Sequence, residues 1–483
     1  MIAKFSGDLS VRQVSFDFGT GCPVVGAFDG GLVSVNGGVP LLREVDEILG
    51  VTKAICRVLP DYRKMPERAT HSKETLVRQS LYQRATGYED TNDADILRSD
   101  PMFMLICGRK PGEWELASQE TLCRFENAVK KAANDVLEEC LIEIYIKKQK
   151  TSPKVIELDM DSTCDPVHGD QEGGIYNGYY GTSCYTHLLM YAGGGFPLGA
   201  RLRVGNAGRA DGALPMLKRT IPRLRKEWPD VQILFRGDNG FATPEIYNYL
   251  ESKSAKYLIC VANNHALKKK PEVRAAIDEA LKEYVQLFGE PKGLTKKEWR
   301  QRQERIRFST KKEGRQQELF ELEQKKVRKY TDFMYQARSW PCPRRVICRI
   351  DFTEEGAKLI FIVTNIKTGT AKWLYEEKYC RRGQCENWIK EMKALKCDRL
   401  SCQEFKTNQF RLLLHTFAYV LVREMRELLG PQDGRISIQA VQNRLLKIGV
   451  TVVSRTRQVF LHWSSWHPWQ TQFQKLMTRL RSG

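Results

Sequence analysis

Four residues that could act on phosphate groups recur within one short stretch of the chain. They are Tyr379, Arg382, Glu386 and Lys393. On an α-helix, which turns by roughly 100° per residue, all four lie within about 60° of one another and share one face. The glutamate could bind a metal ion there, while the tyrosine, arginine and lysine could hold phosphate oxygens. The same spacing is also typical of the solvated face of an ordinary amphipathic helix.

A second stripe on the same helix predicts how it would be anchored. Its members are apolar and occupy a separate sector of the helix; they are Cys385, Trp388, Ile389, Met392 and Leu395. An apolar stripe of this width indicates a helix that packs on a hydrophobic core. We therefore expect the charged face to be held in a fixed position.

Two further carboxylates follow apolar stretches far upstream. KVIELDMDST is typical of a buried strand and carries Asp161, while VQILFRGDNG is typical of another and ends near Asp238. With Glu386 they supply three acidic side chains of the kind that hold two divalent ions in phosphoryl transfer. Such oxygen ligands suit Mg²⁺, for which Mn²⁺ can substitute. Asp159 lies on the same strand face as Asp161, so it is an alternative first ligand.

The net charge indicates a polyanionic partner. The 483 residues include 77 Lys and Arg against 58 Asp and Glu, a net charge of +19. Such a positive field favours nucleic acid. No apolar run is long enough to span a membrane, and the first residues, MIAKFSGDLS, do not resemble a signal peptide. We therefore expect a cytoplasmic protein with no membrane partner.

The 14 cysteines lie mostly in apolar runs, which is typical of reduced thiols rather than of a disulfide scaffold. Four of them, Cys380, Cys385, Cys397 and Cys402, have a spacing that suggests a zinc site. Side chains five residues apart on a helix point about 140° apart, so Cys380 and Cys385 cannot easily share an ion. The sequence therefore disfavours zinc.

The order of apolar strands and amphipathic helices predicts an α/β fold in which helices flank a mixed sheet. Carboxylates at strand ends would lie at the edge where such sheets bind ligands. A glycine-rich start, up to about residue 40, predicts a small β element. The expected segments are a mainly helical DNA-binding region (1–150), the first part of the catalytic core (151–267), a charged helical insertion (268–330), the second part of the core (331–430) and a basic C-terminal region (431–483).

Two segments are candidates for DNA contact. A helix capped by Ser118 carries Arg124 and Lys130 and resembles the recognition helix of a helix-turn-helix, although plain capped helices share its spacing. The insertion, 268–330, has 19 Lys and Arg against 11 Asp and Glu, a net +8. It could grip DNA or form a solvated helical hairpin.

The basic tail adds a third candidate. It contains three tryptophans, Trp463, Trp466 and Trp469. They could contact DNA or pack in a dimer, and the sequence does not choose between these functions.

The spacing within the 379–393 stretch, Y-(2)-R-(3)-E-(6)-K, resembles the third motif of the DDE transposases of bacterial insertion sequences. LDMDST, with Asp161, resembles their first motif, and RGDNGF, with Asp238, resembles the second. GYEDTNDADILRSDP and SQETLCRFEN resemble the insertion-sequence group called thirteen-eighty. The resemblance covers about residues 75–450.

This resemblance implies an RNase H-like catalytic core and cut-and-paste transposition. A homodimer would bind the terminal inverted repeats of double-stranded DNA, hydrolysis would free a 3′-hydroxyl, and that hydroxyl would attack target DNA. The resemblance to members with this third motif also implies a hairpin intermediate at the transposon end. The implied ligands of two metal ions are Asp161, Asp238 and Glu386, which favours Asp161 over Asp159. The implied phosphate contacts are Tyr379, Arg382 and Lys393.

The resemblance leaves three points open. A base-flipping tryptophan is not assigned; Trp340 and Trp373 are the nearest candidates, and either is better interpreted as a core residue. The chain could also be a non-catalytic DNA-binding protein derived from a transposase, although such a protein has no need of the three acids. A nuclease of the same fold that cuts without joining is the other alternative.

Overall fold

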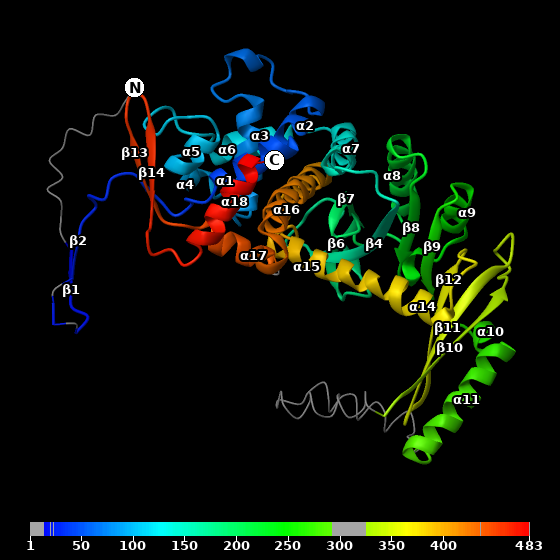
Figure 1. Ribbon diagram of the computed structural model, residues 1–483. Coiled ribbons are helices and arrows are strands. Elements are labelled where there is room, and N and C mark those ends of the chain that lie inside the picture. Colours follow the sequence, from blue (N-terminus) through cyan, green and yellow to red (C-terminus); the bar gives the residue numbers. More distant parts are fainter. Residues whose placement is uncertain (1–13, 20, 23, 292–324, 435, 483) are drawn as a thin grey trace. The chain divides into compact units, whose positions relative to one another are not determined.

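The computed structural model describes residues 14–19, 21–22, 24–291, 325–434 and 436–482. Contacts divide the chain into two compact units, Met1–Cys140 with Glu391–Gly483, and Leu141–Lys390. Figure 1 labels most of the helices and strands of both. No helix within the described ranges is long and apolar enough to cross a membrane. The five-segment division expected from the sequence remains a prediction.

The unit 141–390 is built on a mixed sheet, with nine strands in the described part of the chain. Its centre is parallel: β4 (Val155–Pro166) pairs with β8 (Gln232–Gly237), and β8 pairs with β9 (Lys256–Val261). On the other side of β4 the sheet continues by antiparallel pairing through β6 (Thr182–Ala192), β7 (Phe196–Arg203) and β5 (Ile175–Asn177). The mixed sheet expected from the sequence is therefore present.

Three antiparallel strands extend the sheet beyond β9. They are β12 (Gly356–Thr364), β11 (Arg344–Thr353) and β10 (Val327–Tyr335). In the described residues between β9 and β10 the chain forms two helices, α10 (His265–Lys268) and α11 (Pro271–Phe288). The Tyr284 ring of α11 lies 5.4 Å from the Phe352 ring of β11.

This region corrects part of the expected helical insertion. The apolar stripe of α11, formed by Val273, Ala276, Ala280 and Tyr284, is buried, so this helix is packed rather than solvated. The last residues of the segment, from Val327 onward, form a strand instead of a helix. Residues 292–324 lie outside the described residues.

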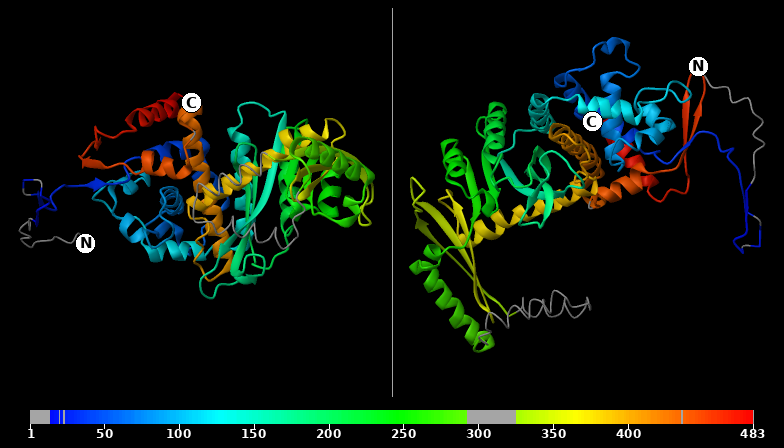
Figure 2. Two further views of the ribbon diagram at one scale, coloured as in Figure 1. Left: turned by 90° about the horizontal axis from the view of Figure 1, so that it is seen from below. Right: turned by 180° about the vertical axis from the view of Figure 1, so that it is seen from behind.

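Strand alternation places different helices on the two faces of the sheet. Tyr257 of β9 stacks on Tyr247 of α9 (Pro244–Ser252), and α9 lies beside α8 (Ala213–Glu227) (Figures 1 and 2). Leu258, the next residue, packs with Leu374 and Tyr379 in another hydrophobic cluster. The segment that contains the predicted third motif therefore covers the face opposite to α9.

That segment is not one regular helix. It consists of α14 (Ala371–Trp373), the π-helical η3 (Leu374–Tyr379), the 3₁₀ turn η4 (Cys380–Gly383) and α15 (Gln384–Ala394). The prediction of an α-helix through Tyr379 and Arg382 is wrong, although it holds from Gln384 onward. For the 3₁₀ turn η4, the physical reason lies at Lys378, whose carbonyl oxygen accepts a hydrogen bond of 2.8 Å from Arg236 Nη1. A side-chain donor at that carbonyl competes with the helical backbone hydrogen bond.

The unit formed by 1–140 and 391–483 is mainly helical, as expected for the N-terminal region. Its helices include α16 (Phe405–Asp433), which packs on α3 (Lys73–Ala85). The others are α1 (Pro40–Leu49), α2 (Val51–Val58), η1 (Pro66–Arg68), α4 (Ala94–Leu97), α5 (Pro101–Ile106), α6 (Gln119–Asn127), α17 (Ile438–Val441), η5 (Gln442–Leu446) and α18 (Gln470–Ser482). The boundaries between the units fall within α7 (Lys131–Lys148) and within α15.

Short strands complete this unit. β1 (Val14–Phe16) pairs with β2 (Val24–Gly26), which matches the small β element expected near the N-terminus. β3 (Val33–Ser34) joins a second sheet with β13 (Val450–Ser454) and β14 (Val459–Trp463). The start and the tail of the chain are therefore hydrogen-bonded in one sheet.

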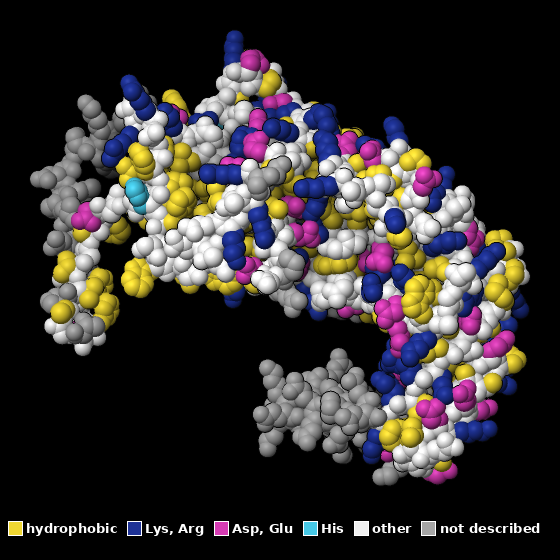
Figure 3. All heavy atoms as spheres, in the orientation of Figure 1, with side chains coloured by type: hydrophobic (Ala, Val, Ile, Leu, Met, Phe, Trp, Pro, Cys, Tyr) yellow, Lys and Arg dark blue, Asp and Glu magenta, His cyan; other side chains and the backbone are white. Residues whose placement is uncertain are grey.

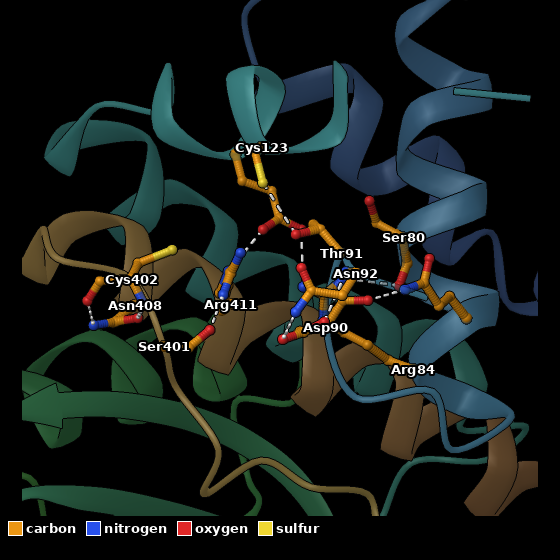
Figure 4. A network of polar contacts seen from close by, with 12 residues as sticks. Ser80, Arg84, Asp90, Thr91, Asn92, Cys123, Ser401, Cys402, Asn408 and Arg411 are labelled. Atoms are coloured by element: carbon orange, nitrogen blue, oxygen red, sulfur yellow. Dashed lines mark hydrogen bonds and ion pairs between the residues drawn. The ribbon is translucent and has the colours of Figure 1, made fainter. Parts of the chain in front are cut away.

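A buried polar network links α3, α6 and α16 (Figure 4). Glu126 is fully buried, and its two carboxylate oxygens accept from Arg84 Nη2 at 2.8 Å and from Arg411 Nε at 2.7 Å. Arg411 also donates to Ser401 Oγ at 2.8 Å. Each charge is paired, because an uncompensated charge at this depth would be strongly destabilising.

Candidate active site

Asp161 lies on β4 beside the motif segment. Its Oδ1 accepts from the Ser162 amide at 2.8 Å, and its Oδ2 accepts from Arg382 Nη1 at 2.9 Å. Burial raises the pKa of Asp161, and the Arg382 guanidinium offsets this only in part. The carboxylate is therefore in a place where a further cation would be favourable.

Asp238 follows β8 directly and lies at the same edge of the sheet. The parallel register pairs Met160 with Gly237, so Asp161 and Asp238 are the next residues on two adjoining strands. Asp238 also caps η2 (Asn239–Phe241), since its Oδ1 accepts from the Gly240 amide at 2.9 Å. Both aspartates line one cavity of about 430 Å³.

Glu386 is connected to the site by its ion pair with Arg382. It lies in the first turn of α15, its side chain is 58% exposed, and its Oε1 is 3.5 Å from Arg382 Nη2. Burial lowers the pKa of Arg382, but Tyr379, Asp161 and Asp238 outweigh burial and raise it. The structure thus brings Asp161 and Glu386 to one guanidinium, and Asp161 and Asp238 to one cavity.

These donors fit a hard divalent cation in their chemistry. All three are carboxylates, and the buried Asp161 already requires a positive partner, which Arg382 supplies. In the described ranges, no three His, Cys, Asp or Glu side chains lie close enough together to hold one ion. Glu386 contacts Arg382 rather than the two aspartates, so joint ligation requires Glu386 to turn toward the cavity.

Asp159 has a different partner from Asp161. It is fully buried and accepts from Arg236 Nε at 2.6 Å and Nη2 at 2.7 Å. Arg236 also lies 3.1 Å from Glu157 Oε2 and donates to the Lys378 carbonyl. Asp159 therefore anchors Arg236, which links β8 to the motif segment, while Asp161 contacts the cavity.

Tyr379 and Lys393 do not line the cavity. Tyr379 is buried in the hydrophobic cluster that covers the sheet, its ring is 5.7 Å from that of Tyr375, and burial raises the pKa of its hydroxyl. Lys393 lies on α15 two turns after Glu386, and its Nζ is 3.5 Å from Asp398 Oδ2. Arg382, by contrast, contacts the predicted metal ligands directly and is the predicted phosphate contact that lies nearest to the acids.

Sequence reasoning missed the other side of the cavity. Its lining includes the last residues of β5 and β7, the turn between β5 and β6, and the loop after β7; these residues are Asn177, Arg203, Tyr179, Tyr180 and Arg209. The signal was the run YNGYYG, because Asn-Gly between short β segments indicates a tight hairpin that can present its neighbours to solvent.

The two candidate tryptophans have different environments. Trp340 is buried, with its ring 5.5 Å from that of Tyr247, and is a core residue as expected. Trp373 is 44% exposed, and Lys378 Nζ lies 5.1 Å from its ring centre, so the core interpretation is wrong for Trp373. Neither lines the cavity described above.

Some charges in the described part of the insertion are paired within the chain. Lys329 Nζ lies 2.7 Å from both Glu279 and Glu283, and Arg328 Nε lies 2.6 Å from Asp351 Oδ1. Figure 3 shows Lys and Arg interspersed with Asp and Glu over α11 and its neighbouring strands. This face therefore carries mixed charge rather than one continuous basic patch.

In the other unit, the predicted recognition helix is α6. Ser118 caps it, and Arg124 is exposed beside Glu120 at 3.7 Å. Among the tail tryptophans, Trp463 Nε1 donates to the Gly37 carbonyl at 2.7 Å, whereas Trp466 is 92% exposed.

Comparison with known proteins gives one family match. A family model described as Transposase DDE domain group 1 matches residues 16–483. No curated protein matches the chain. Among solved structures, the chain is similar to one described as the cryo-EM structure of piggyBac transposase synaptic complex with hairpin DNA. The identity is 11%, the match covers 85% of this chain and 79% of that chain, and the TM-score is 0.39.

Proposed function

Because this chain belongs to the DDE transposase family, we propose that it is an active transposase of a bacterial insertion sequence of the thirteen-eighty group. The observation that carries the proposal is the arrangement of its acids. Asp161 and Asp238 share a cavity where the parallel pairing of β4 with β8 ends, and Arg382 links Asp161 to Glu386. The reaction would be cleavage at the transposon ends followed by joining to target DNA.

Two Mg²⁺ ions, for which Mn²⁺ can substitute, would be held by Asp161, Asp238 and Glu386. When bound, they would activate the attacking oxygen and stabilise the leaving oxygen of the phosphodiester. The chain itself supplies the rigid support for these ligands: β4 and β8 fix the two aspartates, and the buried side of α15 positions Glu386.

When DNA binds, the Arg382 guanidinium would exchange its carboxylate partners for a DNA phosphate. Its guanidinium is the countercharge of Asp161 and Glu386 in the structure. A phosphate at the cavity would offer it two oxygens in the planar geometry that arginine matches best. Arg382 would thereby leave the carboxylates available to metal as the scissile phosphate arrives.

The strand order supports an RNase H-like core as the finer description of the fold. Within the sheet the order β7-β6-β4-β8-β9 combines two antiparallel pairings with two parallel ones, and the expected ligands follow β8 and lie within β4. Such a core would act on double-stranded DNA, with a homodimer holding terminal inverted repeats and target. We also propose a hairpin intermediate at the transposon end, and the resemblance of the third motif is its only support.

The experiment that tests this function uses the DNA that flanks the protein's own gene. Purified protein is incubated with that DNA, Mg²⁺ and a supercoiled target, and the products are separated. Excised ends and end–target joints are expected. Cleaved ends without joints would identify a nuclease, and DNA binding without cleavage would identify a non-catalytic DNA-binding protein; either result contradicts the proposal.

A further inference from the structure

A rigid aromatic turn forms one rim of the cavity. Asn177 Oδ1 accepts from the amides of Tyr179 at 2.9 Å and Tyr180 at 3.3 Å, and Asn177 Nδ2 donates to the Gly205 carbonyl at 2.6 Å. These bonds tie the turn between β5 and β6 to the loop after β7. These hydrogen bonds fix the backbone at the two tyrosines, whose ring centroids lie 4.9 Å apart.

Arg209 connects this turn to the acidic side of the cavity. Its guanidinium lies 5.6 Å from the ring centre of Tyr179, and its Nη1 is 3.3 Å from Asn239 Oδ1. Asn239 follows Asp238 directly. Arg203 Nη1 supports the same loop by donating to the carbonyl oxygens of Gly208 and Arg209, at 3.1 and 3.0 Å.

The exposure of Tyr179 indicates a ligand. Its side chain lines the same cavity as Asp161 and Asp238, yet the residue is 79% exposed. An aromatic ring beside a planar cation is a surface on which nucleobases stack. A cavity of about 430 Å³ also lies within the size range of small-ligand sites.

We propose that Tyr179, supported by Arg209, stacks on the base of a nucleotide that flanks the phosphate to be cut. This rests on the proposed function, because the phosphate is placed by Asp161 and Asp238. The base would leave its own helical stack to reach the ring, so Tyr179 would fix the position of the strand relative to the acids. Tyr179 is a positioning residue for the DNA end.

A double-mutant cycle, in which a protein substitution is combined with removal of a DNA base, tests the stacking contact. End cleavage is measured for wild type and Tyr179→Ala on intact DNA and on two DNAs in which one nucleotide flanking the cut is abasic. On intact DNA the variant should be slower by about 5- to 150-fold, the loss that one base stack accounts for. On one of the abasic DNAs the two proteins should differ by less than about twofold, because the base that stacks is gone. Tyr179→Phe should behave as wild type.

Tyr176 provides the matched control. It lies on β5 of the same hairpin and is 63% exposed, but it does not line the cavity, so Tyr176→Ala should cleave all three DNAs as wild type does. No loss by Tyr179→Ala on intact DNA, or an equal loss on all three DNAs, would overturn the stacking contact while the proposed function stands. Absence of cleavage by wild type would instead overturn the proposed function, and the stacking contact with it.

Discussion

At the scale of single residues, Arg382 connects the acidic groups. Its two terminal nitrogens lie 2.9 Å from Asp161 and 3.5 Å from Glu386. Its neighbour Arg381 is exposed and pairs with Glu377 at 3.3 Å. Two adjacent arginines therefore have different surroundings, which allows the role of one to be tested against the other.

Arg382→Lys keeps the charge but loses the planar fork that can hold two oxygens. We expect the rate of end cleavage to fall by about tenfold or more, since charge-assisted hydrogen bonds are lost, and to fall less than in Glu386→Ala. Arg381→Lys is the matched control and should cleave at the wild-type rate. Equal rates for both lysine variants across a salt series would show that Arg382 is an ordinary solvated side chain.

Asp159 and Asp161 show how two residues on one strand face can have opposite functions. We expect Asp161→Asn to abolish cleavage with little change in stability. We expect Asp159→Asn to retain measurable cleavage but to lower the free energy of unfolding by about 3–5 kcal/mol, because Arg236 loses its buried partner. Thermal unfolding and end cleavage of both variants check this. Active Asp161→Asn beside inactive Asp159→Asn would move the first ligand by two residues.

At the scale of elements, the motif segment explains what sequence could predict. The apolar stripe of α15 was foreseen, and Cys385 and Ile389 are buried. The π-helical and 3₁₀ turns before it were not, and at the 3₁₀ turn the Lys378 carbonyl is bound by Arg236, which is 142 residues away. A helical wheel assumes uniform hydrogen bonding and cannot include a distant donor. The sequence therefore predicted the buried side of α15, but not that Tyr379 would be buried.

Lys393 tests whether α15 grips DNA beyond the acids. Lys393→Ala should weaken binding to the transposon end and flatten the salt dependence by about one unit of slope, the effect of one phosphate contact. Lys226→Ala, an exposed lysine on α8, is the control and should leave both unchanged. Binding titrations from low to high salt measure the slopes. A Lys393→Ala slope equal to wild type would remove this residue from the DNA contacts.

At the scale of the whole molecule, long-range contacts limited the prediction. The order of strands and helices indicated a mixed sheet, but Val33 pairs with Thr451, and Glu126 binds both Arg84 and Arg411. Such partners are separated by 42 to 418 residues, and neither periodicity nor motif spacing specifies them. The cavity wall at Tyr179 was missed for a related reason, since a turn signal does not say which site the turn adjoins.

Glu126 tests the polar network of the helical unit. Burial raises its pKa, but Arg84 and Arg411 outweigh burial, so the folded pKa lies below the ordinary value of 4.5. The resulting stabilisation is present above pH 4.5 and is lost as the pH falls through the folded value. Glu126→Gln should lower the free energy of unfolding by about 3–5 kcal/mol at pH 7, and the difference from wild type should shrink below pH 4.5.

Urea unfolding at several pH values measures this difference. Glu120→Gln, on the exposed side of the same helix, is the control and should change stability by less than about 0.5 kcal/mol. A pH-independent difference between Glu126→Gln and wild type would contradict the assigned charge of the network.

The most direct test of the central claim removes each acid in turn. Asp161→Ala, Asp238→Ala and Glu386→Ala are assayed with Mg²⁺ for cleavage of the transposon end and, separately, for binding to it. The proposed site predicts that each variant loses cleavage by about a thousandfold or more while binding stays close to wild type, because carboxylates ligate metal and contribute little to holding the DNA backbone. Near-normal cleavage by any one variant would remove that residue from the site and contradict the three-carboxylate assignment.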